Sequence, residues 1–259
     1  MPSVFSPLVR AGDVRGAIKM AGELGYQGVE ISLRAPSELD VRELGELLAD
    51  YGVQLSALAT GRVFLEDNLS LTDTDETRRG LAIGRIQEAI DYAAQFAAPV
   101  IIGLVRGIVG SGDRRAALEL LAQGVRECAD YGARKQTYLL VEPINRYETK
   151  LLNSAEETLA LLDLIGRPNV KILLDCFHMN IEEVSMGDTV RRVGDRLGYF
   201  HIADSNRWAP GLGHIDYSDV VAALNDINYN GWLSAEILPL PDDFSAARQA
   251  LNFVKRLRA

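Results

Sequence analysis

Short runs of apolar residues alternate with amphipathic segments along almost the whole chain. Val, Ile and Leu dominate these runs, which is typical of strands that are buried on both faces of a sheet. Strands are predicted over residues 3–9, 28–34, 54–61, 99–107, 137–144, 170–177, 198–205 and 231–238.

The segments between these runs carry apolar residues at helical spacing. The first segment, DVRGAIKMAGELG (13–25), begins with an aspartate that can cap a helix and ends at a glycine. Further helices are predicted over 78–97, 116–135, 217–229 and 245–258.

Eight consecutive strand–helix pairs predict an α/β fold, a closed (β/α)8 TIM barrel that forms a single domain over residues 1–259. A closed barrel is favoured over an open doubly wound sheet at this chain length. No GxGxxG motif follows the first predicted strand, so the pattern does not indicate a dinucleotide-binding site.

Composition narrows the function classes. With 47% apolar residues the chain can bury a large core, and its net charge of −9 argues against a protein that binds nucleic acid. Two cysteines, Cys128 and Cys176, are too few for a disulfide framework, and we interpret both as small apolar residues in the interior. No secretory pattern or long apolar run is present, so we expect a cytoplasmic protein without membrane contact.

The last four predicted strands each carry a residue that can bind a metal ion. TIM barrels place their chemistry at the carboxyl ends of the strands. One acidic residue in an apolar strand can be a structural ion pair, but buried unpaired charges are costly, and four on consecutive strands favour a metal site. Three carboxylates and one imidazole suit Mn²⁺, Mg²⁺ or Co²⁺ better than a thiolate-bound structural zinc. The four residues are Glu142, Asp175, His201 and Glu236.

The run FHIADSNRWAPGLGHID (200–216) contains two of the three histidines of the chain. It starts like a strand and continues into Gly and Pro, so we interpret it as a strand end followed by a loop over the active site. His201 is then a metal ligand. Other polar or aromatic residues, in this run or just after the strand predicted over 170–177, can each be explained by a structural role when considered alone. They are His178, Asp204, Asn206, Trp208 and His214.

These residues resemble those of the xylose-isomerase-like TIM-barrel sugar isomerases and epimerases, and among them the D-tagatose 3-epimerase type. The segments IIGLVRG, ADSNRWAPG and LPLP are most similar to the 5-keto-L-gluconate epimerase branch. The matching stretches are GYQGVEISLR (25–34), EPINRYETKLLNS (142–154), LLDCFHMNIEE (173–183), FHIADSNRWAPGLGHIDY (200–217) and AEILPLP (235–241).

The resemblance implies that Glu142, Asp175, His201 and Glu236 bind one divalent ion, usually Mn²⁺, and that the two glutamates also transfer the proton. It further implies that His178 and Arg207 hold the substrate oxygens on the carbonyl side, and that Glu148 is an acid beside the site. Cys176 stands where many relatives have threonine, a change that we expect to affect packing only.

The segment VRGIVGSGD (105–113) lacks the bulky aromatic residue that covers the pocket in several relatives that act on free ketoses. It contains Arg106, at or just past the end of a predicted strand and therefore at the barrel mouth. A guanidinium group is well suited to hold a carboxylate. We therefore expect Arg106 to bind the carboxylate of a keto-uronate such as 5-keto-L-gluconate or D-tagaturonate. The alternative is that Arg106 pairs with a loop carboxylate such as Asp113 or points to solvent.

Together, these patterns predict a metal-dependent epimerase that inverts C3 of a ketose or keto-uronate through an enediolate. Inversion requires an acid–base group on each face of the carbon, and Glu142 and Glu236 are predicted to fill these roles. A hydroxypyruvate or inosose isomerase, an inosose dehydratase, a keto-acid lyase or decarboxylase, and a non-catalytic sugar-binding barrel remain alternatives. An endonuclease-IV type nuclease is disfavoured by the three histidines and the acidic charge.

The expected partner is a small sugar or sugar acid, and the exposed helical faces within 78–135 could serve a homo-oligomer.

Overall fold

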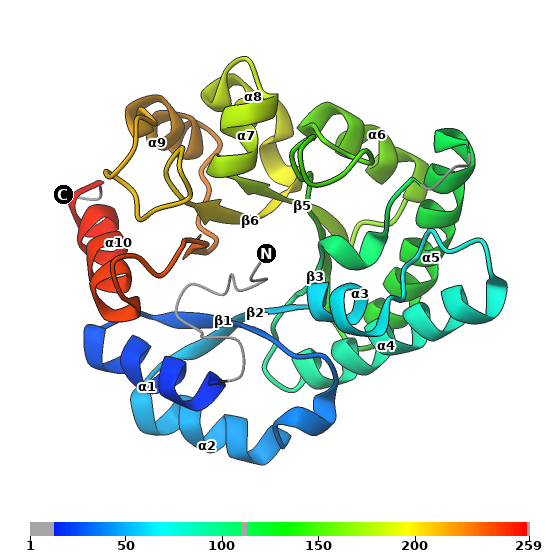
Figure 1. Cartoon of the computed structure of the whole chain (residues 1–259), viewed down its shortest axis with the longest axis horizontal. Helices are drawn as coiled ribbons and strands as arrows, with labels where there is room; N and C mark the ends of the chain where they lie inside the picture. The colour runs from blue at the N-terminus through cyan, green and yellow to red at the C-terminus, as the bar shows by residue number, and fades with distance from the viewer. Residues whose placement is uncertain (1–12, 110–112, 258–259) are drawn as a thin grey trace.

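The computed structural model describes residues 13–109 and 113–257. Seven parallel strands form a single sheet that curves into a nearly closed barrel, with the helices on its outside (Figure 1). The strands follow one another around the barrel in chain order. They are β1 (Gly28–Ser32), β2 (Gln54–Ala59), β3 (Val100–Ile102), β4 (Leu139–Val141), β5 (Val170–Asp175), β6 (Leu197–Ile202) and β7 (Leu233–Ala235).

Six of these strands lie within predicted strands, β6 begins one residue before its predicted range, and the predicted fold class is confirmed. The eighth predicted strand, residues 3–9, falls outside the described residues. The other seven predicted strands were all too long at their carboxyl ends, by two to five residues. After β3 the chain turns into the 3-10 helix η2 (Leu104–Arg106), and after β5 it enters α7 (Cys176–Glu182) without a loop.

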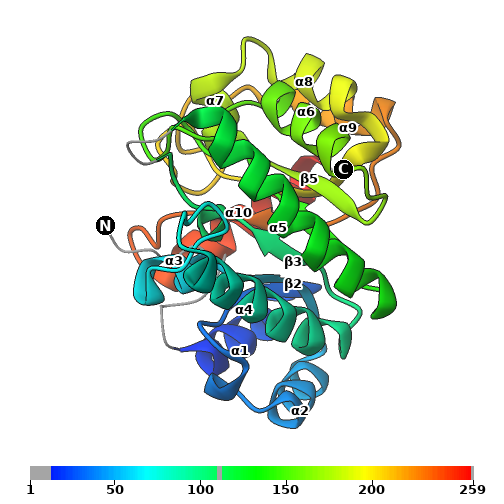
Figure 2. The same ribbon diagram turned by 90° about the vertical axis from the view of Figure 1, so that its right-hand side faces the viewer.

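The helices alternate with the strands, and most begin where an Asp or Ser side chain accepts a backbone N–H group of the first turn. Figure 2 shows α4 and α5 lying along the outside of the barrel. The remaining elements are α1 (Val14–Leu24), η1 (Pro36–Glu38), α2 (Val41–Tyr51), α3 (Gly61–Asp67), α4 (Glu76–Ala94), α5 (Arg114–Arg134), α6 (Ala155–Ile165), α8 (Met186–Val193), η3 (Gly194–Arg196), α9 (Tyr217–Asp226) and α10 (Asp243–Leu257).

Both faces of each strand are buried, which explains the uninterrupted apolar runs. In β3, Val100 and Ile102 pack outward against the helices, whereas Ile101 points into the barrel. In β4, Leu140 points inward in the same way, and the two residues beside it face the helices. Strand side chains alternate between faces, so a buried barrel strand needs an apolar residue at nearly every position.

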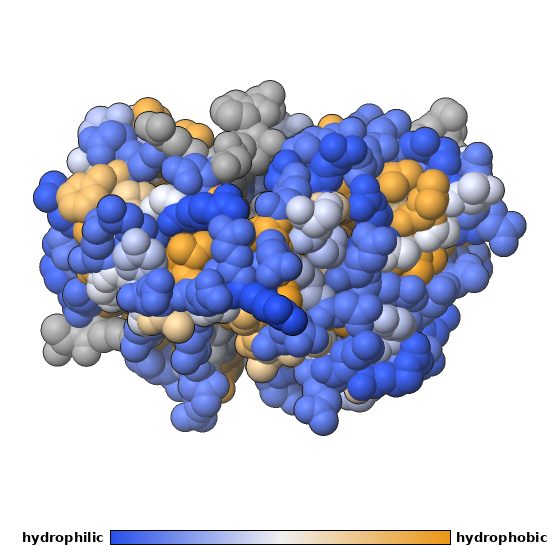
Figure 3. Space-filling view, turned by 90° about the horizontal axis from the view of Figure 1, so that it is seen from below, coloured by the Kyte–Doolittle hydropathy of each residue, from blue (hydrophilic) through white to orange (hydrophobic). Residues whose placement is uncertain are grey.

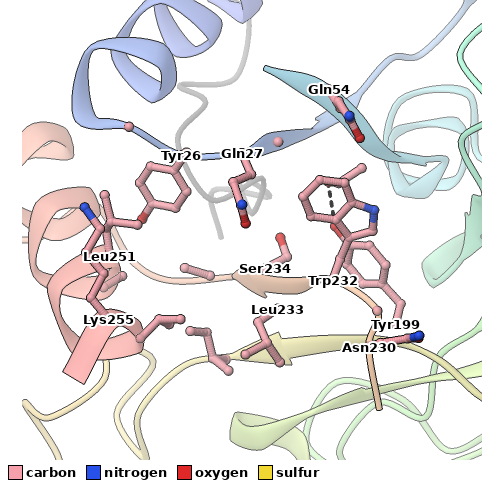
Figure 4. Close-up of a pocket in the computed structure, with 18 of the residues that line it drawn as sticks. Tyr26, Gln27, Gln54, Tyr199, Asn230, Trp232, Leu233, Ser234, Leu251 and Lys255 are labelled. Atoms are coloured by element: carbon pink, nitrogen blue, oxygen red, sulfur yellow. Dashed lines mark hydrogen bonds between the residues drawn. The ribbon is translucent and has the colours of Figure 1, made fainter. Parts of the chain in front are cut away.

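The edge between β1 and β7 differs from the rest of the barrel. Within residues 13–109 and 113–257, β1 pairs only with β2 and β7 pairs only with β6. A cavity of about 870 Å³ lies at this edge, lined by both strands, the segments before them and α10. Figure 4 shows Tyr26, Trp232 and Ser234 among its labelled side chains.

The surface in Figure 3 is mostly hydrophilic, and its apolar residues lie in separate patches. None of the helices in the described part of the chain is both long and apolar enough to cross a membrane. Cys128 and Cys176 are free and buried, which agrees with their interpretation as interior residues.

Candidate active site

Four neighbouring strands bring the candidate metal ligands to one end of the barrel. Asp175 is the last residue of β5, and its partner in the parallel register of β6 is His201. Glu142 directly follows β4, and Glu236 directly follows β7. Since the carboxyl ends of parallel strands meet at the same end of a barrel, the four side chains converge there.

The four side chains lie close enough to share one ion. The Nδ1 atom of His201 is 3.1 Å from Glu236 Oε2 and 3.8 Å from both Glu142 Oε1 and Asp175 Oδ2. One potential ligand atom from each residue lies within 4.8 Å of the others. The structure thus groups all four residues that the strand-end pattern selected.

The atoms that face one another in this cluster have no hydrogen-bond partner among the residues that the structure describes. They are Glu142 Oε1, Asp175 Oδ2, His201 Nδ1 and Glu236 Oε2. Buried acceptors are normally satisfied, and three carboxylates this close repel one another. A divalent cation would satisfy all four atoms and offset the negative charge, and this donor set fits Mn²⁺, Mg²⁺ or Co²⁺.

Asp175 is oriented by the helix that follows it. Its Oδ1 atom accepts the backbone N–H of Phe177 at 2.7 Å and so caps α7, which turns Oδ2 toward the cluster. The side chain is completely buried. Burial, together with the nearby Glu236 carboxylate, raises the pKa of Asp175. A bound cation would oppose this shift, because it favours the ionised carboxylate.

His201 contacts an acidic residue on its other side. Its Nε2 atom lies 2.8 Å from Oε2 of Glu30, a buried residue of β1. Burial alone would lower the pKa of His201, but the Glu30 and Glu236 carboxylates outweigh it and raise the pKa well above its usual range. The sequence analysis missed Glu30, although an acidic residue inside the apolar run GVEIS carries the same signal that selected Glu142.

Arg207 brings a positive charge to the cluster. Its Nη2 atom lies 3.0 Å from Glu236 Oε2 and its Nη1 atom lies 3.5 Å from Glu148 Oε1. The guanidinium group also stacks on the Phe177 ring, 4.7 Å from the ring centroid. Arg207 has a φ of +62°, a left-handed conformation that is rare for residues other than glycine and that the surrounding loop must enforce.

The loop after β6 is organised around the buried side chain of Asp204. Its Oδ1 atom accepts the N–H groups of Ser205 and Ile215, and its Oδ2 atom accepts that of Gly211 at 2.7 Å. Burial disfavours the ionised form, but these backbone N–H groups outweigh it and lower the pKa of Asp204. Asp204 therefore stabilises the loop that holds Arg207. Asn206 and His214 bond within the same loop, in line with their structural interpretation.

Replacement of Asp204 by alanine should destabilise the protein at neutral pH by on the order of 3 kcal/mol, because it removes a charged acceptor from buried backbone donors. The loss should shrink at acid pH. A lowered carboxyl pKa stabilises the fold above the ordinary aspartate pKa, and this contribution disappears as the pH falls through the lower pKa of the folded state. Denaturant unfolding at several pH values measures both effects, and equal stability of the two proteins at neutral pH would contradict this assignment.

His178 and Glu148 are joined through Asn145. The Asn145 side-chain amide donates to Glu148 Oε1 at 2.9 Å and contacts His178 Nδ1 at 2.8 Å. Burial and the charge of Arg207 lower the pKa of His178 well below its usual range, so its ring is neutral. A neutral ring that accepts at Nδ1 carries its proton on Nε2, and this atom lies 3.8 Å from Glu142 Oε1. Asn145 is a further residue that the sequence analysis missed.

Arg106 does not lie as expected. It is in η2, just past the end of β3, but its side chain is completely buried and is not among those that line the active-site cavity. Its Nη1 atom donates to the backbone carbonyl of Glu142. The alternatives of a pair with Asp113 and of an exposed side chain are wrong as well, because the side chain is buried and its Nε and Nη2 atoms have no hydrogen-bond partner among the described residues. The 3-10 turn directs the guanidinium group inward.

Three of the four candidate ligands, Glu142, His201 and Glu236, line a cavity of about 640 Å³. Its apolar lining includes Phe64, Leu65 and Leu238. This volume falls within the range of pockets that hold small molecules, and the few polar groups converge near the cluster. The polar and charged side chains along its wall include Glu30, Glu142, Glu148, His178, Arg207 and Glu236.

Residues 18–257 match the family model described as xylose isomerase-like TIM barrel. The chain belongs to this family. An L-ribulose 3-epimerase from Methylomonas sp. (strain DH-1) is 34% identical over 229 residues, which are 87% of this chain and 79% of the relative. A crystal structure of D-allulose 3-epimerase from Methylomonas sp. in complex with D-allulose is 30% identical, has a TM-score of 0.84, and covers 97% of this chain and 93% of that one.

The family also includes an isomerase with a different substrate. Hydroxypyruvate isomerase from Escherichia coli (strain K12) is 28% identical over 239 residues, which are 88% of each chain. These relatives confirm the predicted xylose isomerase-like family and the expectation of an isomerase of the sugar-epimerase type. The narrower similarity to the 5-keto-L-gluconate epimerase branch stays a prediction.

Proposed function

We propose that the protein is a metal-dependent ketose 3-epimerase in which Glu142 and Glu236 exchange the proton at C3. The observation that carries this proposal is the group of four buried, facing ligand atoms at the wall of a sugar-sized cavity. Relatives that are named ketose 3-epimerases support it. The proposed cofactor is one Mn²⁺ ion, with Mg²⁺ or Co²⁺ as alternatives, held by the four residues of the cluster.

When bound, the divalent ion would act as a Lewis acid that makes the carbon next to the carbonyl group more acidic. The two glutamates supply the proton transfer. Glu142 follows β4 and Glu236 follows β7, with two strands between them, so they approach the cluster from different sides. One glutamate removes the C3 proton to give the enediolate, and the other returns a proton on the opposite face.

Two further side chains are suited to hold the substrate. Neutral His178 presents Nε2–H next to Glu142, where it can donate to a substrate oxygen. Arg207 lies against Glu236 and keeps that carboxylate in place while its guanidinium group lines the cavity. Both roles follow the resemblance, and Glu148 supports them through Asn145 and Arg207.

The test is turnover of neutral ketoses by protein supplied with Mn²⁺. D-Fructose, D-psicose, L-ribulose and, for the isomerase alternative, hydroxypyruvate are offered in turn, and NMR identifies each product. The proposal predicts the C3 epimer of at least one ketose and no aldose. Formation of an aldose, or of tartronate semialdehyde from hydroxypyruvate, would instead favour the isomerase alternative, which the E. coli relative represents.

One observation favours a keto-uronate as a second candidate substrate. The Nε and Nη2 atoms of Arg106 are buried and have no hydrogen-bond partner among the described residues. Burial lowers the pKa of Arg106 to about 10, and the charge of Glu142 only partly opposes this shift. A buried cation with free donors is suited to an anion. Since Arg106 does not line the cavity, this function also requires its side chain to turn toward the substrate.

If Arg106 binds a substrate carboxylate, Arg106→Leu should lower kcat/KM on D-tagaturonate by roughly 10- to 100-fold, the loss expected for a charge-assisted hydrogen bond. The value for neutral ketoses should fall less, because those substrates lose only the support that Arg106 gives to the backbone of Glu142. Arg106→Lys keeps the charge and serves as the matched variant, and thermal unfolding of both variants checks their fold. Equal losses on the two substrate classes would show that Arg106 acts only on the protein structure.

A further inference from the structure

Glu30, a residue of β1 at one edge of the sheet, contacts residues of β6 and β7 at the other end of the strand order. Its Oε2 atom lies 2.8 Å from His201 Nε2 on β6 and accepts the hydroxyl of Ser234 on β7 at 3.2 Å. Glu30 itself belongs to β1, which is not paired with β7 in the described part of the chain. A single carboxylate therefore bridges the open edge of the barrel.

The bridge lies between two cavities. Glu30 lines the active-site cavity, and Ser234 lines the cavity between β1 and β7, where Figure 4 labels it. Glu30 is 1% exposed and its side chain is 2% exposed, so water does not compete freely for these hydrogen bonds. The His201 ring is also packed edge-on against Tyr199, with ring centroids 5.4 Å apart. His201 is thus restrained on the side that faces away from the cluster.

We propose that Glu30 is a positioning residue that holds His201 in the one tautomer that can bind the metal. Metal binding requires the neutral imidazole, which has one N–H donor and one acceptor nitrogen. The Glu30 carboxylate accepts from Nε2–H, which leaves the Nδ1 lone pair facing Glu142, Asp175 and Glu236. Ser234 donates to the same oxygen and orients the carboxylate. This inference rests on the proposed metal-dependent function.

The other tautomer would be costly at this position. A proton on Nδ1 would remove that nitrogen from the ligand set, while Nε2 would face the Glu30 carboxylate without a proton between them. A hydrogen bond from the second nitrogen of a ligating histidine to a carboxylate fixes both tautomer and ring orientation. Loss of such a partner typically weakens metal affinity by 10- to 100-fold.

The test compares two substitutions of nearly equal size. Glu30→Met removes the acceptor, whereas Glu30→Gln keeps an oxygen that can accept from Nε2–H. Calorimetric titration of metal-free protein with Mn²⁺ should show affinity roughly 10- to 100-fold weaker for Glu30→Met. Glu30→Gln should stay much closer to the wild type. Thr158→Val is the control, because it removes a buried side-chain hydrogen bond to Ser154 that involves neither Glu30 nor Tyr199.

Each outcome decides the inference. Equal losses for Glu30→Met and Glu30→Gln, or none for either, would overturn it, since a purely structural role does not depend on the acceptor. If Glu30→Met does not fold, Ser234→Ala must still weaken Mn²⁺ binding by a smaller, measurable factor, and unchanged affinity overturns the inference. A wild-type protein that binds no Mn²⁺ overturns the proposed function and this inference together. If only the role assigned to Glu30 is wrong, the wild-type protein still binds Mn²⁺ and is still active.

Discussion

Replacement of Glu142 or of Glu236 by glutamine is expected to remove measurable epimerisation while the fold remains intact. Each glutamate is assigned the proton transfer on one face of C3, and an amide cannot take or give that proton at a useful rate. General acid–base catalysis contributes roughly 10²–10⁴-fold, so a loss at least this large is expected in kcat. The variant that keeps the glutamate removing the proton should retain exchange of the C3 proton with solvent deuterium, because removal and return use different groups.

This result requires two checks on the variants. Both glutamates belong to the cluster, so Mn²⁺ must be added to saturation and the bound metal measured by elemental analysis. Glu156→Gln, at an exposed position in the first turn of α6, loses one carboxylate far from the chemistry and should keep wild-type activity. Near wild-type epimerisation by either active-site variant, with its metal content confirmed, would show that the two-base scheme is wrong.

Removal of divalent ions is expected to abolish turnover, and Mn²⁺ at one ion per chain should restore it. Three of the four facing atoms belong to carboxylates and Arg207 pairs directly with only one of them, so the cluster without a cation is electrostatically unfavourable. Mn²⁺ should also stabilise the fold, by about 2.7 kcal/mol when the free ion is at 100 times its dissociation constant.

Thermal unfolding with and without Mn²⁺ measures this stabilisation independently of activity. Asp175→Asn is the matched variant, because asparagine can still cap α7 while it loses the charge that faces the ion. It should unfold at a temperature that depends much less on Mn²⁺. Full activity of protein shown by elemental analysis to be metal-free would contradict the metal-dependent account.

The periodicity of the sequence was sufficient to predict the barrel, because the physical requirement behind it is local. A strand buried on both faces must be apolar at nearly every position, as β3 and β4 are. The four strand-end residues could be found for a similar reason. A charged residue at the end of such a run stands out, and the fold brings all of these ends to one place.

Contacts that depend on the exact path of the chain could not be predicted. Arg106 was expected at the mouth of the barrel because it follows an apolar run. The turn at η2 instead directs its side chain under the backbone of Glu142. Glu30 is distant from His201 in sequence and on the other edge of the sheet, so only the curvature of the barrel brings the two together. Periodicity contains no information on either contact.

Solvent deuterium offers the most direct test of C3 epimerisation. D-Fructose is incubated in D₂O with Mn²⁺-loaded protein, and NMR locates the deuterium in substrate and product. The account predicts D-psicose as product, with deuterium at C3 and none at C1, and no incorporation with metal-free protein. Deuterium at C1 together with an aldose product would contradict it, because that pattern requires proton transfer between C1 and C2 on the same site.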